Sequence, residues 1–147
     1  MIPGKLPLVL LLALAAPLAG GCIITSDDDD VIDGAFDVSW TVSDGNQPVS
    51  CQQAGADKVS YLFTRQYNGT GFEDLFDCAD FVGTTVRYPI DDYTYVASLL
   101  DCPNNQPGCP GSTTLSQTDP LVDTLYTCNS IEDQTCYVTL PTIEFGI

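Results

Sequence analysis

The first stretch of the chain determines the compartment in which the remainder must fold. Lys5 is followed by residues 6–18, an apolar run of 13 residues without a charge, and then by small residues as far as Gly21. A membrane-spanning helix needs about 20 apolar residues. The run is therefore too short to cross a bilayer and is typical of the core of a secretion signal. The sequence predicts export, with residues 1–21 as the signal peptide.

Cys22 comes directly after the small residues, and this arrangement resembles the lipobox of bacterial lipoprotein signals. In that family the cysteine is acylated on sulfur, the preceding peptide is removed, and the cysteine becomes the first residue of the mature protein. The resemblance implies a lipid bilayer as partner through acylated Cys22. It also implies a location in the bacterial cell envelope, at the outer membrane on its periplasmic or surface face. Two alternatives remain open, namely ordinary secretion with an unmodified Cys22 and an uncleaved membrane anchor.

Residues 22–33 are predicted to tether the folded part of the chain to this cysteine. Four consecutive aspartates occupy positions 27–30. They repel one another and bury no apolar surface, so an extended and disordered segment is expected. The acidic run has two interpretations. It is a solvated spacer, or it resembles a signal for export to the outer leaflet that some bacterial lipoproteins carry just after the cysteine.

Net charge limits the partners of the mature chain. The full sequence carries a net charge of −16, and loss of Lys5 with the signal leaves three basic residues against 20 acidic ones, a net charge of −17. Such a surface repels nucleic acid and anionic lipid headgroups. It favours cations, basic partners or simple solubility.

Alternating apolar and polar residues predict an all-β domain over residues 34–147. Phe36, Val38, Trp40 and Val42 alternate with polar residues, which is the pattern of a half-buried strand with Trp40 in the core. Further strands are expected at residues 58–67, 72–78, 84–88, 93–100, 113–118, 121–128 and 136–140, with one helical turn at 51–56. The last two strands are interpreted as a hairpin. Short strands separated by turns indicate a single β-sandwich of about seven strands.

Three local patterns together resemble the prealbumin-like and immunoglobulin-like domains of exported bacterial lipoproteins. They are Trp40 in an alternating first strand, Cys51 and Cys78 flanking the second and third strands, and a Tyr88-Pro89 turn before a strand at Tyr93. The resemblance implies a β-sandwich without catalytic residues. It also implies a buried disulfide between Cys51 and Cys78, and a Tyr93 hydroxyl that bonds the backbone at a corner of the sandwich.

Six cysteines remain beyond Cys22, an even number that favours three disulfides in an oxidising compartment. From the 15 pairings that six cysteines allow, we predict Cys51–Cys78, Cys102–Cys109 and Cys128–Cys136. The last two pairs are sequence neighbours around polar loops, where a hairpin brings Cα atoms within the roughly 4.4–6.8 Å that a disulfide tolerates. Cys51 and Cys78 are then the two cysteines left to pair, which agrees with the resemblance to immunoglobulin-like domains.

The residue types present favour binding over catalysis. The chain has no histidine, which excludes the usual Ser-His-Asp and Cys-His arrangements and histidine-ligated zinc. It also lacks P-loop and G-x-S-x-G motifs. We therefore predict no enzymatic activity and no cofactor, and a non-catalytic interaction, adhesion or scaffold module with an envelope or surface protein as partner. The alternative is a calcium-binding envelope module, with Asp91 and Asp92 as the candidate ligands of Ca²⁺.

Overall fold

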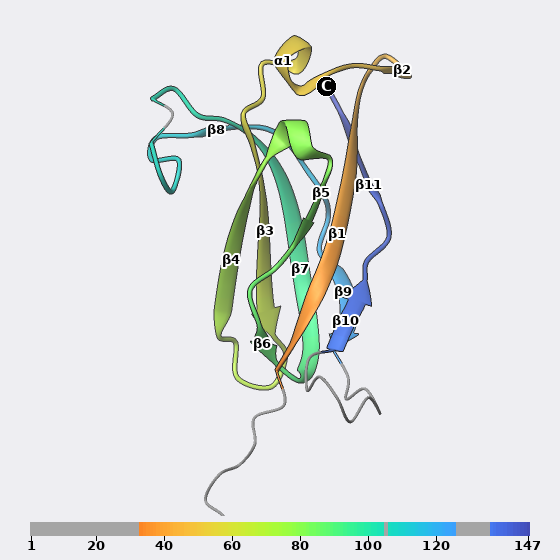
Figure 1. The fold of residues 1–147 in the computed structure, drawn as a ribbon, viewed down its shortest axis with the longest axis vertical. Coiled ribbons are helices and arrows are strands. Elements are labelled where there is room, and N and C mark those ends of the chain that lie inside the picture. The colour runs from red at the N-terminus through yellow and green to blue at the C-terminus, as the bar shows by residue number, and fades with distance from the viewer. Residues whose placement is uncertain (1–32, 105, 126–135) are drawn as a thin grey trace, which may run out of the picture.

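The computed structural model describes residues 33–104, 106–125 and 136–147, which form an elongated sandwich of two β-sheets (Figure 1). The predicted all-β sandwich is confirmed. Two short helical segments accompany the strands, α1 (Cys51–Ala54) and the 3₁₀ turn η1 (Cys78–Asp80). No helix in the described part of the chain is long and apolar enough to span a membrane.

The described residues form eleven strands, more than the seven expected, because several partners of β1 are short separate pieces. The strands are β1 (Asp33–Asp44), β2 (Gln47–Pro48), β3 (Lys58–Arg65), β4 (Gly71–Asp77), β5 (Val82–Thr84), β6 (Tyr88–Pro89), β7 (Asp91–Asp101), β8 (Thr113–Gln117), β9 (Leu121–Leu125), β10 (Cys136–Thr139) and β11 (Ile143–Gly146).

The first sheet is built around β1. Strands β2, β5 and β6 pair with it in antiparallel fashion, whereas β10 and β11 pair with it in parallel. Asp37 of β1 pairs with Thr84 of β5 and also with Thr139 of β10, so these two partners lie on opposite edges of β1. The second sheet has the order β4-β3-β7, with β8 and β9 both pairing with β7.

The core lies between the two sheets and is rich in aromatic rings. Each long strand turns alternate side chains inward because successive residues of a strand point to opposite faces. The rings of Phe36 on β1 and Phe63 on β3 stack across the interface with their centroids 4.7 Å apart. Trp40 is 1 % exposed, and its Nε1 donates to the carbonyl of Cys78 at 2.9 Å. The prediction that Trp40 belongs to the core is confirmed.

The strand expected at residues 84–88 is instead divided into β5 and β6. The hydroxyl of Thr85 accepts a hydrogen bond from the backbone nitrogen of Phe36 at 3.0 Å, in the place that a carbonyl would take in a regular ladder. The same hydroxyl donates to the carbonyl of Val86 at 2.8 Å. The side chain thus interrupts the pairing between β5 and β6, although Thr85 itself remains buried.

The prediction that residues 121–128 and 136–140 form a hairpin is wrong. Strand β9 pairs with β7 in the second sheet, while β10 pairs with β1 in the first. The two strands therefore belong to opposite layers of the sandwich. The parallel pairing with β1 joins residues about a hundred positions apart, as in the pair Gly34 and Cys136, and local sequence contains no signal for it.

Two of the three predicted disulfides are confirmed. Cys51–Cys78 joins the start of α1 to η1, and Cys102–Cys109 closes a loop after β7, with Cα separations of 5.8 Å and 5.3 Å. Cys128 lies outside the described residues, so its predicted pairing with Cys136 stays a prediction.

The corner expected at Tyr93 is also present. The Tyr93 hydroxyl donates to the carbonyl of Pro89 at 2.7 Å, four residues earlier in the chain. The bond fixes the turn that leads from β6 into β7. Because the ring of Tyr93 is fully buried, the same residue fills the core and holds the corner.

Removing the Cys51–Cys78 disulfide should destabilise the protein more than removing Cys102–Cys109. The two bridges span 27 and 7 residues of sequence, and in the chain-entropy model closure stabilises by about 3.5 and about 2.4 kcal/mol respectively. Chemical denaturation of the two double-alanine variants measures the difference. Equal losses, or a larger loss for the Cys102/Cys109 variant, would contradict this expectation.

Candidate functional site

The outer face of the first sheet contains a hollow of about 320 Å³, which we call the β1–β5 hollow. Its lining consists of Asp37, Val38, Ser39, Val82, Gly83, Thr84 and Thr139. Three strands that are distant in sequence supply these residues, namely β1, β5 and β10. The hollow opens to solvent on the long side of the sandwich.

Strand register brings the polar side chains of the hollow together. Asp37 and Ser39 alternate with the inward-facing residues of β1, so both point away from the core. The hydroxyl of Thr84 donates to Oδ1 of Asp37 at 2.7 Å. Beside them, the hydroxyls of Ser39 and Thr142 share a hydrogen bond of 2.7 Å. The hollow thus presents one carboxylate beside hydroxyl groups that already form hydrogen bonds.

The floor of the hollow is held in place from the core. A Cβ atom added at Gly83 would lie 2.3 Å from Cδ1 of Phe76, so β5 approaches the ring closely only because this residue is a glycine. From the inner side, the hydroxyl of Tyr61 donates to the carbonyl of Ser39 at 3.3 Å. Burial raises the pKa of Tyr61 well above its usual value.

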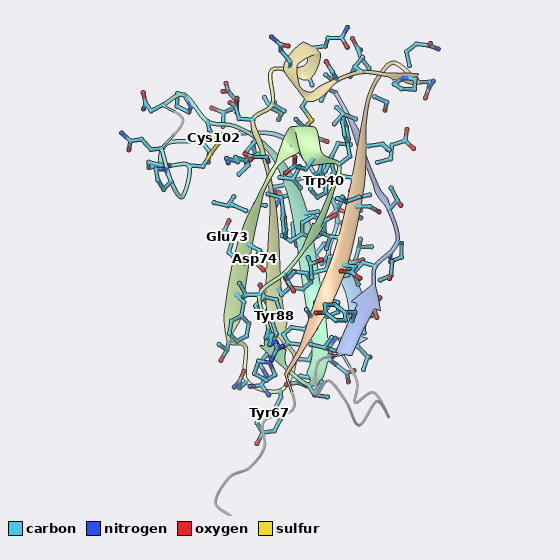
Figure 2. The ribbon with its side chains drawn as sticks, in the orientation of Figure 1. Trp40, Tyr67, Glu73, Asp74, Tyr88 and Cys102 are labelled. Atoms are coloured by element: carbon cyan, nitrogen blue, oxygen red, sulfur yellow. A yellow bond between two sulfur atoms is a disulfide. The ribbon has the colours of Figure 1, made fainter. Side chains whose placement is uncertain are left out.

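A second buried tyrosine fixes the chain between β5 and β6. Asp74 on β4 accepts hydrogen bonds from the hydroxyl of Tyr88 at 2.7 Å and from the backbone nitrogen of Val86 at 3.0 Å (Figure 2). Burial raises the pKa of Tyr88 far above its usual value, and the hydrogen bond to Asp74 raises it further. Asp74 therefore has a structural role in positioning the residues that follow the hollow.

The chemistry of the hollow suits binding. Of the seven residues that line it, Asp37 is the only one with a titratable side chain. General acid–base catalysis on a sugar or peptide normally uses two such groups or a nucleophile beside a base. A single carboxylate with neighbouring hydroxyls and the 62 % exposed side chain of Val82 offers hydrogen bonds and apolar contact instead.

The candidate calcium ligands are both engaged by other groups. Oδ2 of Asp91 forms an ion pair with Nε of Arg65 at 2.7 Å. Oδ1 of Asp92 accepts from the hydroxyl of Thr124 at 2.5 Å. Within the described residues, no group of three or more acidic, cysteine or histidine side chains is arranged to hold a metal ion. A bound cation would have to compete with Arg65 for Asp91.

The remaining predicted site residues fall into two groups. Cys51, Cys78, Cys102 and Cys109 form the disulfides described above. Cys22 lies outside the described residues, as do residues 23–32 of the predicted tether, whereas Asp33 at its end begins β1. The residues of the β1–β5 hollow were not predicted from the sequence. Asp37 and Thr84 are 47 positions apart, and alternation within β1 indicates that Asp37 points outward without indicating what lies beside it.

Comparison with known proteins does not assign the chain to a family. No protein-family model matches the chain, and no curated protein matches its sequence. Among solved structures, the chain is similar to part of a leucine-rich repeat protein from Bacteroides thetaiotaomicron, with a TM-score of 0.44 and 14 % sequence identity. The match covers 80 % of this chain and 14 % of the other, so this chain spans about a seventh of that protein's length. A likeness at this level supports no inference about function.

Calcium should leave the melting temperature unchanged, because Arg65 and Thr124 already occupy the carboxylates of Asp91 and Asp92. A ligand that binds only the folded state stabilises it by about 2.7 kcal/mol at a hundredfold excess over its Kd. Calorimetry in EDTA and in millimolar Ca²⁺ checks this. A rise in melting temperature that Asp91→Asn abolishes would instead support the calcium-binding alternative.

Proposed function

We propose that this chain is a non-catalytic interaction module held at a bacterial envelope by an acylated Cys22. The apolar residues 6–18, the small residues after them and the cysteine at position 22 support export and acylation. The location proposed is the outer membrane, on its periplasmic or surface face. A protein of the envelope or cell surface is the proposed partner.

The two disulfides of the sandwich are the main structural support for the proposal that the protein is exported. Cys51 and Cys78 are buried at one end of the core, and Cys102 and Cys109 close a separate loop. Disulfides persist in oxidising compartments and are rare in the bacterial cytosol. The bridges therefore support an extracytoplasmic location without any use of the signal sequence.

The interaction half of the proposal is supported by the β1–β5 hollow. Strands β1 and β5, which supply most of its lining, run along the long side of the sandwich (Figure 1), so the hollow stays accessible when the chain is held by one end. Hydroxyl groups and one carboxylate supply directional hydrogen bonds, while Val82 supplies apolar area that is exposed in the free protein. Non-obligate protein interfaces have about the same share of apolar area as the rest of a protein's surface, and the composition of the hollow is compatible with such an interface.

Replacing Cys22 with serine should release the protein from membranes. Serine accepts no thioether-linked lipid, and stable anchoring takes more than one acyl chain. Fractionation of cells that express each form, together with incorporation of labelled palmitate, measures the effect. Cys102→Ser/Cys109→Ser is the matched control, because it removes cysteines without touching position 22. If wild-type protein takes up no label, or if the Cys22→Ser variant still sediments with membranes, the anchoring proposal is wrong.

A photo-crosslinking amino acid at Val82 should capture the partner in native envelopes. Val122 on β9 is the matched control, since it is the same residue type, is 64 % exposed against 62 % for Val82, and belongs to the second sheet. We expect a discrete crosslinked band from position 82 and none from position 122. Bands of equal strength at both positions, or none at either, would argue against the hollow as the interaction surface.

A further inference from the structure

Strand register extends the β1–β5 hollow toward an exposed aromatic residue. Asp37 of β1 pairs with Thr84 of β5 on one side and with Thr139 of β10 on the other. Residues that pair across neighbouring strands point to the same face of the sheet, so the carboxylate stands between two threonine hydroxyls. Two residues earlier on the same two strands, Ala35 of β1 pairs with Tyr137 of β10. Tyr137 therefore shares the outer face with Asp37, and its side chain is 56 % exposed.

The spacing of these residues suits one long side chain of a partner. Asp37 and Tyr137 are diagonal neighbours across the β1–β10 pair, and such neighbours lie about 7–8 Å apart, within reach of a single long side chain. On the β5 side, the exposed side chain of Val82 stands beside Ser39 on the same face. The hollow of about 320 Å³ is at the small end of the range for ligand pockets, which is about 300–1,000 Å³. It therefore suits a side chain better than an extended ligand.

The carboxylate of Asp37 keeps acceptor capacity for such a partner. Lys58 and Arg65 each form an ion pair with another aspartate, whereas Asp37 forms none within the described part of the chain. The Thr84 hydroxyl donates to Oδ1 of Asp37 at 2.7 Å. Its other oxygen, Oδ2, has no hydrogen bond among the residues that the structure describes. An ionised carboxylate has about four acceptor positions, so the hollow contains a negative charge that a donor can still reach.

The acceptors and the charge together specify the class of ligand. A carboxylate only accepts hydrogen bonds, and hydroxyl oxygens accept them as well. On a chain with a net charge of −16, such a site favours a ligand that is positively charged and supplies donors. A Ca²⁺ ion fits poorly, because it takes six to eight oxygen ligands and Asp37 is the only carboxylate that lines the hollow. An organic cation remains, and in a protein partner this means an arginine or a lysine side chain.

We propose that the β1–β5 hollow receives an arginine side chain of the partner protein. This proposal rests on the proposed function, in which the hollow is the interaction surface. The guanidinium carries five N–H donors in a planar fork, so it can donate to Oδ2 of Asp37 and to the hydroxyl of Thr139 together. Its flat face stacks on the ring of Tyr137, and its methylene stem lies on Val82. Lysine lacks the planar fork and makes only part of these contacts.

Titration with a short peptide tests this ligand. The probe is a blocked glycine-arginine-glycine peptide, and the controls contain citrulline or lysine in place of arginine. Citrulline keeps the shape of arginine without its charge. The backbone amide signals of the isotope-labelled protein are followed by NMR up to tens of millimolar peptide. We expect saturable shifts concentrated in β1, β5 and β10 with the arginine peptide, at least about threefold lower affinity for the lysine peptide, and no saturable shifts with citrulline.

Two matched pairs of variants identify the contacts. Asp37→Asn should lower the affinity for the arginine peptide at least about tenfold, because it removes a charged acceptor. Asp44→Asn removes the same charge from the exposed last residue of β1 and should leave the affinity unchanged. It lies about 20 Å from position 37 along the strand, beyond the Debye length of about 8 Å at physiological ionic strength. Tyr137→Leu should lower the affinity roughly two- to fivefold, whereas Tyr137→Phe, which keeps the ring, should not.

The outcomes separate this proposal from the one on which it rests. Absence of saturable shifts, equal affinity for the arginine and citrulline peptides, or equal affinity of Asp37→Asn and Asp44→Asn would each refute the arginine ligand. Shifts spread over the whole acidic surface would refute it too. If the photo-crosslink from position 82 in native envelopes forms nonetheless, the hollow remains the interaction surface and only its arginine ligand is wrong. If the arginine peptide binds while no crosslink forms, the envelope partner is wrong and the ligand chemistry of the hollow stands.

Discussion

The fold depends on one buried point of backbone, the peptide at Cys78. Its carbonyl accepts from the indole nitrogen of Trp40 at 2.9 Å, its nitrogen donates to the carbonyl of Asp57 at 2.9 Å, and its sulfur is bonded to Cys51. A buried indole N–H without an acceptor would cost on the order of 1–3 kcal/mol. The first sheet, the end of β4 and helix α1 are therefore joined at a buried position, where water does not compete for these hydrogen bonds. The aromatic core fills the space between the two sheets next to it.

Much of the fold can be predicted from sequence because its causes are local. Alternation in β1 identifies Trp40 as a core residue. The corner at Tyr93 is what the resemblance to immunoglobulin-like domains implies. The disulfide after β7 follows from its short loop, whereas Cys51–Cys78 is the pair left after the two loop pairs are assigned, and the resemblance implies it as well. The errors concern pairings between distant segments. The sequence pattern predicts one hairpin for strands β9 and β10, yet long-range packing places them in different sheets.

The candidate site could not be predicted for the same reason. The β1–β5 hollow depends on Asp37 meeting Thr84 on one side and Thr139 on the other. Neither neighbour is near Asp37 in sequence, and none of the three residues belongs to a recognisable motif. The close approach of Gly83 to Phe76 is likewise visible only after the two sheets have packed. Sequence reasoning indicates which residues point outward, whereas the structure shows which of them share a surface.

The parallel pairing of β1 with β10 and β11 has a consequence for how the chain folds. Gly34 pairs with Cys136 and Ser43 with Gly146, so the first strand acquires one whole edge of partners from the C-terminal strands. Pairings between distant segments form slowly, because closing a long loop costs conformational entropy before the contacts that offset this cost can form. When the chain is synthesised or exported starting from its N-terminus, one edge of β1 therefore stays unpaired until β10 and β11 become available. We expect the second sheet, whose β3–β4 ladder joins neighbouring segments, to form first and to serve as the template on which β1 is finally closed.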